Sequence, residues 1–245
     1  MKFTPVVLAI LAAASSAAHA APSSLLTRLS AAAPNANPKV IELALQAHEC
    51  ATATGVAPRA TRLAVIDYSL PSTTRRMWVF DLAKQKLMYD EFVAHGQGTG
   101  DNMARNFSNK DGSHATSLGL FTTAETYHGG NGYSLRMDGL EKGINDNARA
   151  RAIVMHGAPY VNPALAKTQG RLGRSWGCPA LRPEVAKEVI DNLKQGQMLF
   201  AYYPDKNWLA NSPFLTCKTR TVAAATSRGG SSAGGINAGI SARPR

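Results

Sequence analysis

The sequence predicts a β-sheet domain with a few flanking helices. From Arg62 onward the chain consists of short runs rich in β-branched and aromatic residues, separated by loops rich in glycine, asparagine and aspartate. Such runs are typical of strands. One helical pattern precedes them and another lies near their C-terminal end. The 245 residues are enough for one main core with appendages, but not for two domains of ordinary size.

The first helical pattern begins at Asn37. Asn37 can cap a helix, Pro38 suits the first helical position, and Gly55 can end the pattern. The apolar face consists of Val40, Ile41, Ala44 and Leu45. The preceding residues 21–36 are rich in alanine, serine and proline, and we expect them to be poorly ordered. Residues 21–60 are therefore expected to form an N-terminal linker and helix.

The strand-like runs follow one another from Arg62 to Tyr203. They are residues 62–70, 75–82, 87–96, 118–127, 133–140, 149–158 and 197–203. The polar stretch Ala-Lys-Gln-Lys at 83–86 predicts a turn, and thus a hairpin between the second and third runs.

A second helical pattern occupies residues 182–196. Pro183 lies near its start, Gly196 can end it, and its apolar residues recur at helical spacing. This pattern precedes the last strand-like run. We expect residues 61–205 to form one sheet-based domain, followed by a C-terminal extension at 206–222. Residues 223–245, rich in glycine, serine and alanine, are expected to be a disordered basic tail.

The N-terminus has the pattern of a secretory signal peptide. Lys2 precedes an apolar stretch at residues 6–14, and Ala18-His19-Ala20 is a small-x-small cleavage site. The apolar stretch is shorter than the ~20 residues that span a bilayer. We therefore expect residues 1–20 to be removed, leaving a secreted protein without a transmembrane anchor, periplasmic or associated with the cell wall.

The charge balance is strongly basic. The formal net charge is +11, and without Lys2 the remaining 26 basic and 16 acidic residues give +10. This charge favours an anionic partner. The basic residues are scattered and not interleaved with aromatic side chains, and together with export this argues against nucleic acid.

Three cysteines in an exported chain predict one disulfide and one free thiol. Cys50 and Cys217 lie on either side of the predicted sheet domain, and we expect them to pair. Cys178 is then the free thiol.

Two candidate nucleophiles lie three positions apart, Ser175 and Cys178. Residues 173–177 fit the G-x-S-x-G pattern of the α/β-hydrolase nucleophile elbow, in which an acid and then a histidine follow the serine. Here every histidine precedes Ser175. The stretch before it is polar and interrupted by glycine, and Pro179 stands where the next helix would begin. The serine-hydrolase interpretation therefore fails.

Cys178 needs less activation than a serine, because a free thiol already ionises by a few per cent at neutral pH. A nearby imidazole can raise this thiolate fraction further. His95 and His156 both end apolar strand-like runs, and spacing alone does not choose between them, although His156 is closer in sequence. Gly177 would allow its own N–H and that of Cys178 to face a developing oxyanion. The alternative is a buried structural thiol.

Four segments resemble the murein L,D-transpeptidases with a YkuD-like catalytic domain. Met-His-Gly at 155–157 followed by Arg-Ser-Trp-Gly-Cys-Pro-Ala-Leu at 174–181 is similar to that family's catalytic signature. Thr-Ser-Leu-Gly-Leu-Phe at 116–121 and Val-Ala-His-Gly-Gln-Gly-Thr-Gly at 93–100 resemble two earlier strands of the family. The resemblance extends from about residue 62 to residue 203.

The resemblance implies a β-sandwich and a set of roles. Cys178 would be the nucleophile and His156 its base, with the Gly157 carbonyl orienting the imidazole. His95 would be a strand-end residue near the cleft. The residues implied to shape the oxyanion and substrate region are Arg174, Ser175 and Gly177.

Three features depart from the family pattern. Trp176 stands where most members have histidine, and Ala180 where arginine or asparagine is common. The separation of 22 positions between His156 and Cys178 is also somewhat long. These departures affect the expected substrate detail, and leave the proposed nucleophile and base in place.

The implied activity is transfer of a peptidoglycan stem peptide through a Cys178 thioester, giving 3→3 crosslinks or exchanged stems. The alternatives are an L,D-carboxypeptidase or endopeptidase that uses water as acceptor, and a wall-binding protein whose site has decayed. Thiol–disulfide exchange is disfavoured because Cys-x-x-Cys is absent. No metal or other cofactor is expected, because the metal-ligand patterns are absent from the sequence.

Overall fold

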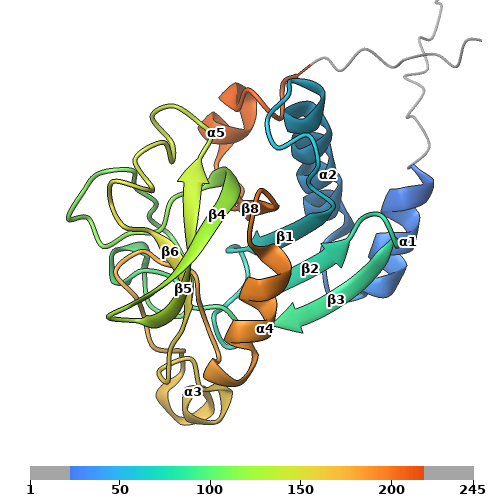
Figure 1. Cartoon of the computed structure of the whole chain (residues 1–245). Coiled ribbons are helices and arrows are strands. Elements are labelled where there is room, and N and C mark those ends of the chain that lie inside the picture. The colour runs from blue at the N-terminus through green and yellow to red at the C-terminus, as the bar shows by residue number, and fades with distance from the viewer. Residues whose placement is uncertain (1–22, 218–245) are drawn as a thin grey trace, which may run out of the picture.

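The computed structural model describes residues 23–217, in which eight strands form one continuous sheet (Figure 1). The strands are β1 (Arg62–Asp67), β2 (Met77–Asp81), β3 (Lys86–Glu91), β4 (Gly119–Gly129), β5 (Gly132–Gly139), β6 (Val154–Gly157), β7 (Ala180–Leu181) and β8 (Met198–Tyr202). Their order is β3-β2-β1-β8-β4-β5-β6-β7. The pairs β1/β8 and β6/β7 are parallel and the others antiparallel. The expected signal peptide and basic tail lie outside the described residues.

The sheet is buried on both faces where β1, β2 and β8 lie together. In β1, Leu63 and Val65 enter an outer core, whereas Ala64 and Ile66 enter an inner one. This follows from the two-residue period of a strand. The inner core also receives side chains from β4, β5 and β6, so the two halves of the sheet enclose it between them. The predicted β-sandwich with flanking helices is confirmed.

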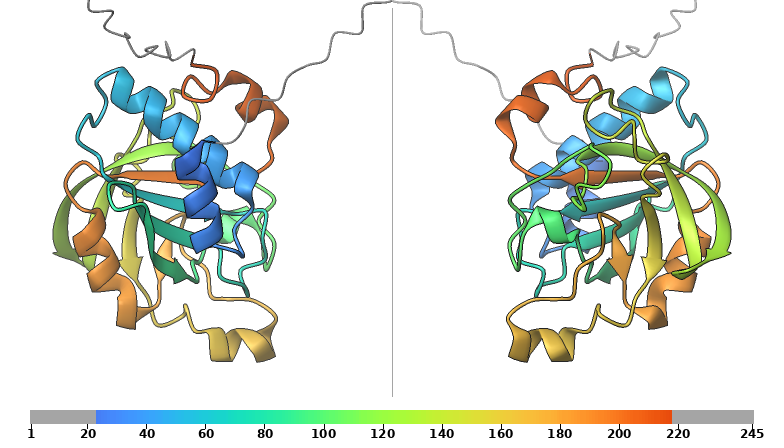
Figure 2. Two further views of the ribbon diagram at one scale, coloured as in Figure 1. Left: turned by 90° about the vertical axis from the view of Figure 1, so that its right-hand side faces the viewer. Right: turned by 90° about the vertical axis from the view of Figure 1, so that its left-hand side faces the viewer.

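Five α-helices lie around the sheet in the described part of the chain. They are α1 (Ser24–Ala32), α2 (Pro38–Ala53), α3 (Pro163–Gln169), α4 (Pro183–Leu193) and α5 (Lys206–Asn211). Figure 2 shows α1 and α2 together on one side of the sheet, where α2 packs on β1 and β8 and α1 on β3. α4 packs against β6, β1 and β5 and completes the inner core. The two helices predicted from the sequence, α2 and α4, are confirmed.

The expected poor order of residues 21–36 is wrong for the described residues from Ser23 onward, because α1 lies there. The Ser23 hydroxyl caps the helix by accepting a hydrogen bond from the Leu26 N–H at 3.2 Å. Leu26 and Leu29, three residues apart, are buried against α2 and the outer core. This short apolar face was missed because the segment is rich in alanine and serine.

Two predicted strands are shorter than expected. The run at 87–96 leaves the sheet after Glu91, although Ala94 pairs again with Ala180 in an isolated bridge. The run at 149–158 becomes a strand only at Val154, because the residues before it turn tightly and Ala152 has a positive φ of 54°. Both departures place chain segments near the cavity at the end of β6.

The C-terminal extension is partly built into the core. On α5, the buried Trp208 donates its indole N–H to Glu141 Oε2 at 2.9 Å. Beyond it, Cys217 forms a disulfide with Cys50 of α2, and their Cα atoms are 6.0 Å apart. None of the helices between residues 23 and 217 has the length and apolar content needed to cross a bilayer.

Candidate active site

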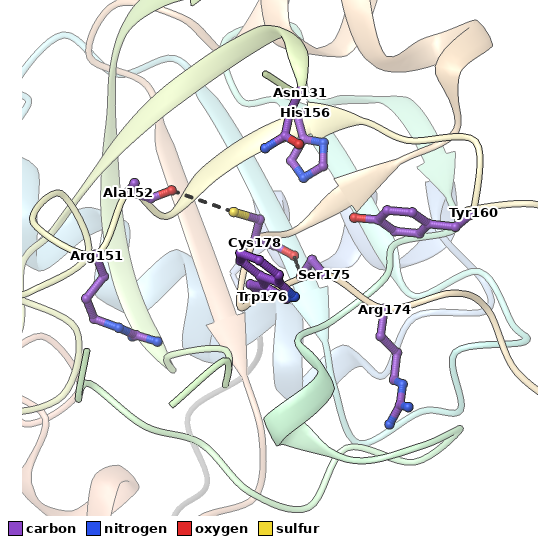
Figure 3. A pocket seen from close by; sticks show the side chains of 9 residues that line it. All are labelled: Asn131, Arg151, Ala152, His156, Tyr160, Arg174, Ser175, Trp176 and Cys178. Carbon is purple, nitrogen blue, oxygen red and sulfur yellow. Dashed lines mark hydrogen bonds between the residues drawn. The ribbon is translucent and has the colours of Figure 1, made fainter. Parts of the chain in front are cut away.

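A cavity of about 400 Å³ opens beside the end of β6. Nine residues line it (Figure 3): Asn131, Arg151, Ala152, His156, Tyr160, Arg174, Ser175, Trp176 and Cys178. The structure thus brings together four side chains singled out from the sequence, those of His156, Arg174, Ser175 and Cys178.

The segment that carries Cys178 is held by residues 94–97. The Gln97 N–H donates to the Ser175 carbonyl at 2.8 Å, and Ala94 forms a bridge with Ala180 on the far side of the cysteine. These backbone bonds hold both ends of residues 175–180, which we call the nucleophile loop after the role that the sequence leads us to expect for Cys178.

Thr116 supports the middle of the nucleophile loop. Its hydroxyl donates to the Gly177 carbonyl at 3.1 Å and accepts from the Gly96 N–H at 3.0 Å. Gly177 itself has a φ of +119°, and a Cβ at this position would lie 2.8 Å from the Ala115 carbonyl oxygen. Only glycine fits such a backbone without strain. A peptide C=O and N–H point in opposite directions, so the Thr116 contact turns the Cys178 N–H away from Thr116.

The Ser175 hydroxyl closes the nucleophile loop internally. It donates to the Cys178 carbonyl at 2.7 Å and accepts from the Gly177 N–H at 3.1 Å. The sequence suggested that the N–H groups of Gly177 and Cys178 would both face an oxyanion. In the structure the Gly177 N–H is occupied by Ser175, because the hydroxyl two residues earlier lies within its reach, and the Cys178 N–H is left for that role.

The Cys178 thiol is nearly buried, with 7% of the residue exposed. The sulfur accepts from the Val154 N–H at 3.4 Å and donates to the Ala152 carbonyl at 3.7 Å. Burial raises the pKa of the thiol, and the Val154 N–H and the charge of Arg151 oppose that rise. The resting side chain is therefore a neutral thiol.

The His156 imidazole faces the same cavity. Its Nδ1 lies 3.0 Å from the Gly157 carbonyl oxygen, which can only accept, so Nδ1 carries the proton and Nε2 is free to take one. Burial lowers the pKa of His156, which keeps the ring neutral near pH 7. The parallel pairing of His156 with Ala180 aligns the end of β6 with the segment that follows Cys178.

His95 lies behind the nucleophile loop and does not line the cavity. It is buried, its Nδ1 accepts from Arg76 Nη2 at 2.8 Å, and its Nε2 donates to the Gly100 carbonyl at 3.3 Å. Burial and the charge of Arg76 lower the pKa of His95 to about 4. Its own carbonyl accepts from the Ser175 N–H at 3.0 Å. The structure therefore places His156 in the cavity wall and His95 outside it, a choice that spacing in the sequence left open.

Several cavity residues were not found from the sequence. Tyr160 directs its hydroxyl toward the cavity in Figure 3, and burial raises its pKa to about 12, so the hydroxyl keeps its proton and can donate. Asn131 and Arg151 come from turns whose approach depends on strand pairing. Of these three residues, only Tyr160 could have been suspected from the sequence, because it lies four residues after His156.

The mouth of the cavity carries an exposed aromatic side chain. Trp176 is 69% exposed, and its ring stacks on that of His114 with centroids 4.9 Å apart and planes inclined by 6°. Arg174, next in line, donates to the Gly100 carbonyl and pairs with Asp101, both at 3.0 Å. The side chains of Trp176 and Arg174 both belong to the lining of the cavity.

The arrangement can support nucleophilic acyl transfer. A thiol and a neutral imidazole with one free nitrogen line a single cavity, and the backbone N–H of Cys178 adjoins the thiol. A nucleophile, a base and a nearby N–H donor are the parts that this chemistry requires. Within residues 23–217, no group of three or more histidine, cysteine, aspartate or glutamate side chains is placed to hold a metal ion.

Comparison with known families gives one broad match. The model of the L,D-transpeptidase catalytic domain family matches residues 32–202. This range begins well before Arg62 and includes α2. No curated protein sequence matches the chain.

Solved structures also resemble the chain at low identity. An L,D-transpeptidase from Mycobacterium smegmatis has a TM-score of 0.36 and 16% identity, over 59% of each chain. One from Mycobacterium tuberculosis has a TM-score of 0.35 and 16% identity, over 58% of each chain. One from Stackebrandtia nassauensis has a TM-score of 0.35 and 15% identity, over 59% of this chain and 57% of its own. The chain thus covers less than two thirds of each of these proteins.

Proposed function

The chain belongs to the L,D-transpeptidase catalytic domain family, and we propose on that premise that it is an exported cysteine L,D-transpeptidase acting on peptidoglycan stem peptides. One observation carries the proposal. The Cys178 thiol and the His156 imidazole line one cavity, and the Gly157 carbonyl holds the imidazole with Nε2 free.

The proposed reaction begins with proton transfer from the Cys178 thiol to His156 Nε2. The sulfur then attacks the carbonyl at the L-centre of the diaminopimelate residue in a tetrapeptide stem. The C–N bond to the terminal D-Ala breaks, and the leaving amine takes the proton back from His156. The product is a thioester on Cys178.

The second half of the reaction releases the acyl group. An amine from a neighbouring stem attacks the thioester and gives a 3→3 crosslink, with its proton passing to His156 and then to the departing sulfur. The same route with water as acceptor would give a trimmed tripeptide. The basic charge of the chain suits a polymer that carries carboxylates.

The remaining cavity residues have supporting roles in the proposal. The Cys178 N–H would donate to the oxyanion, and one such donor is typically worth ~3 kcal/mol of the barrier. Ser175 and Gly177 would keep that N–H in place through the contacts described above. Arg174 would contact the substrate at the cavity entrance, beside Trp176.

The test is to incubate the protein with a tetrapeptide stem and identify both protein and products by mass. We expect an acyl adduct on Cys178, loss of D-Ala and a crosslinked product. Cys178→Ala should give none of these, whereas the matched variant Cys50→Ser/Cys217→Ser, which removes the other two cysteines, should retain the adduct.

The other outcomes separate the alternatives. If only hydrolysis products form, the protein is an L,D-carboxypeptidase or endopeptidase and not a transferase. Binding of stem peptides without any adduct on Cys178 would indicate a wall-binding protein with a decayed site, and would contradict the proposal.

A further inference from the structure

The guanidinium of Arg151 is held by four hydrogen bonds, and Arg151 lines the same cavity as Cys178. Arg151 lines the cavity and directly precedes Ala152, whose carbonyl accepts from the Cys178 thiol. Its Nη1 donates to the Ser108 carbonyl and the Ser117 hydroxyl, both at 2.7 Å. Its Nη2 donates to the Ser113 hydroxyl at 3.1 Å and to the Ala115 carbonyl at 2.7 Å.

All four acceptors of Arg151 are neutral oxygens. Among the described residues no carboxylate forms an ion pair with Arg151, and the acidic group that acts on it, Asp111, does so from beyond ion-pair distance. Arg174, the other arginine of the cavity, is paired with Asp101. Arg151 therefore brings a fixed positive charge, with no carboxylate at ion-pair distance among the described residues, to a half-buried position where solvent screens it weakly.

Formation of a thiolate at Cys178 would be favoured by such a positive charge. Proton transfer from Cys178 to His156 creates a thiolate and an imidazolium, and burial opposes both. The other titratable groups around the thiol are Tyr160 and Arg174 in the cavity wall and the buried Tyr68 beneath the loop. The described wall contains no carboxylate, and the acidic group that opposes the charge of Arg151 is Asp111, outside that wall.

We propose that Arg151 is a positioning residue that stabilises the Cys178 thiolate by holding a fixed positive charge in the wall of the same cavity. The proposal rests on the proposed role of Cys178 as nucleophile. The four neutral acceptors have a purpose in this scheme, because they orient the guanidinium without neutralising it, as a carboxylate would.

The test measures the thiol directly. Cys178 is alkylated with iodoacetamide across a pH series, and the rate of mass increase gives the midpoint at which the thiolate forms. Arg151→Gln removes the charge, Arg151→Lys keeps it, and Arg149→Gln is the matched control. Arg149 lies two residues away, outside the cavity wall, and already pairs with Glu125 and Asp138.

We expect Arg151→Gln to move the alkylation midpoint upward by about one pH unit, which lowers the rate about tenfold below the midpoint. Arg151→Lys should move it less, and Arg149→Gln should leave it unchanged. Thermal unfolding shows that each variant is folded. If Arg151→Gln does not fold, wild type and Arg151→Lys are compared alone, and a lysine midpoint within half a pH unit of wild type supports the proposal.

Two results would overturn the proposal. One is an Arg151→Gln midpoint equal to that of wild type. The other is a lysine variant displaced as far as the glutamine variant, or by half a unit or more where it is tested alone, because loss of the loop contacts would then account for the effect. Because alkylation needs no stem peptide, failure of this proposal is distinguishable from failure of the proposed transpeptidase activity.

Discussion

The Ser175 hydroxyl lies 2.7 Å from the carbonyl oxygen of Cys178, to which it donates a hydrogen bond. The residue that resembles a hydrolase nucleophile is thus a structural bridge within the loop of the other candidate. In its second contact the same hydroxyl accepts from the Gly177 N–H, so both hydrogen bonds stay within this loop.

Ser175→Ala is expected to slow acylation but to leave the adduct on Cys178. The substitution leaves the buried Gly177 N–H and Cys178 carbonyl without their partner, at a cost of ~1–3 kcal/mol. Unfolding in denaturant and mass mapping of a carbapenem adduct measure the two effects, with Ser175→Thr as the variant that keeps the hydroxyl. Disappearance of the adduct with unchanged stability would contradict the structural role.

Gly177→Ala is expected to inactivate the protein. A side chain at this positive φ costs ~1–3 kcal/mol in strain, and its Cβ would meet the Ala115 carbonyl and the Ile153 side chain. The matched control is Gly170→Ala, also at a positive φ but with open space around it. Gly170 has left-handed helical angles, so we expect less strain there than at Gly177, and loss of stem-peptide acylation only in Gly177→Ala. Normal acylation by Gly177→Ala would show that the loop tolerates another backbone conformation.

Stability is expected to fall as the pH drops from about 6.5 toward 4. The folded-state pKa values of His48, His95 and His156 lie below the ordinary 6.5, that of His95 at about 4. The unfolded chain therefore binds more protons in this window, and the free energy of unfolding decreases with falling pH. His95 alone contributes up to ~3 kcal/mol.

His95→Asn tests that assignment. Denaturant unfolding across the pH series should show a shallower slope for the variant than for wild type. His128→Asn, an exposed histidine on β4, is the control and should keep the full slope. Equal slopes in all three proteins would remove His95 as a source of the acid sensitivity.

Trp176→Ala is expected to weaken stem-peptide binding without unfolding the protein. The indole is largely exposed and stacks on His114, so stability should change by no more than ~0.5 kcal/mol. We expect a several-fold higher KM with kcat nearly unchanged, and alkylation by iodoacetamide at the wild-type rate. A fall in kcat at unchanged KM would instead place the ring in the reaction itself.

Local patterns explain what could be predicted. The alternating runs and the helical faces of α2 and α4 depend on neighbours within a few residues, and these elements were found. The helix α1 was missed because two leucines in an alanine- and serine-rich stretch give a weak signal. Its burial depends on α2 and the outer face of the sheet, which only the folded chain supplies.

The functional site depends on contacts that spacing does not reveal. His95 and His156 both end strand-like runs, and only the pairing of β6 with β7 brings His156 alone to the cavity. Arg151 was not singled out because its position is set by Ser108, Ser113 and Ser117, on a loop more than thirty residues earlier. The occupied Gly177 N–H likewise follows from loop geometry.

The disulfide between Cys50 and Cys217 joins residues 167 positions apart, and so encloses nearly the whole described body of the protein. A protease that cuts any surface loop between them produces two fragments that remain one covalent molecule. The fragment bearing His156 cannot diffuse away from the one bearing Cys178, even after a cut at α3 between them. Such a nicked chain migrates as a single species until a reductant separates its parts.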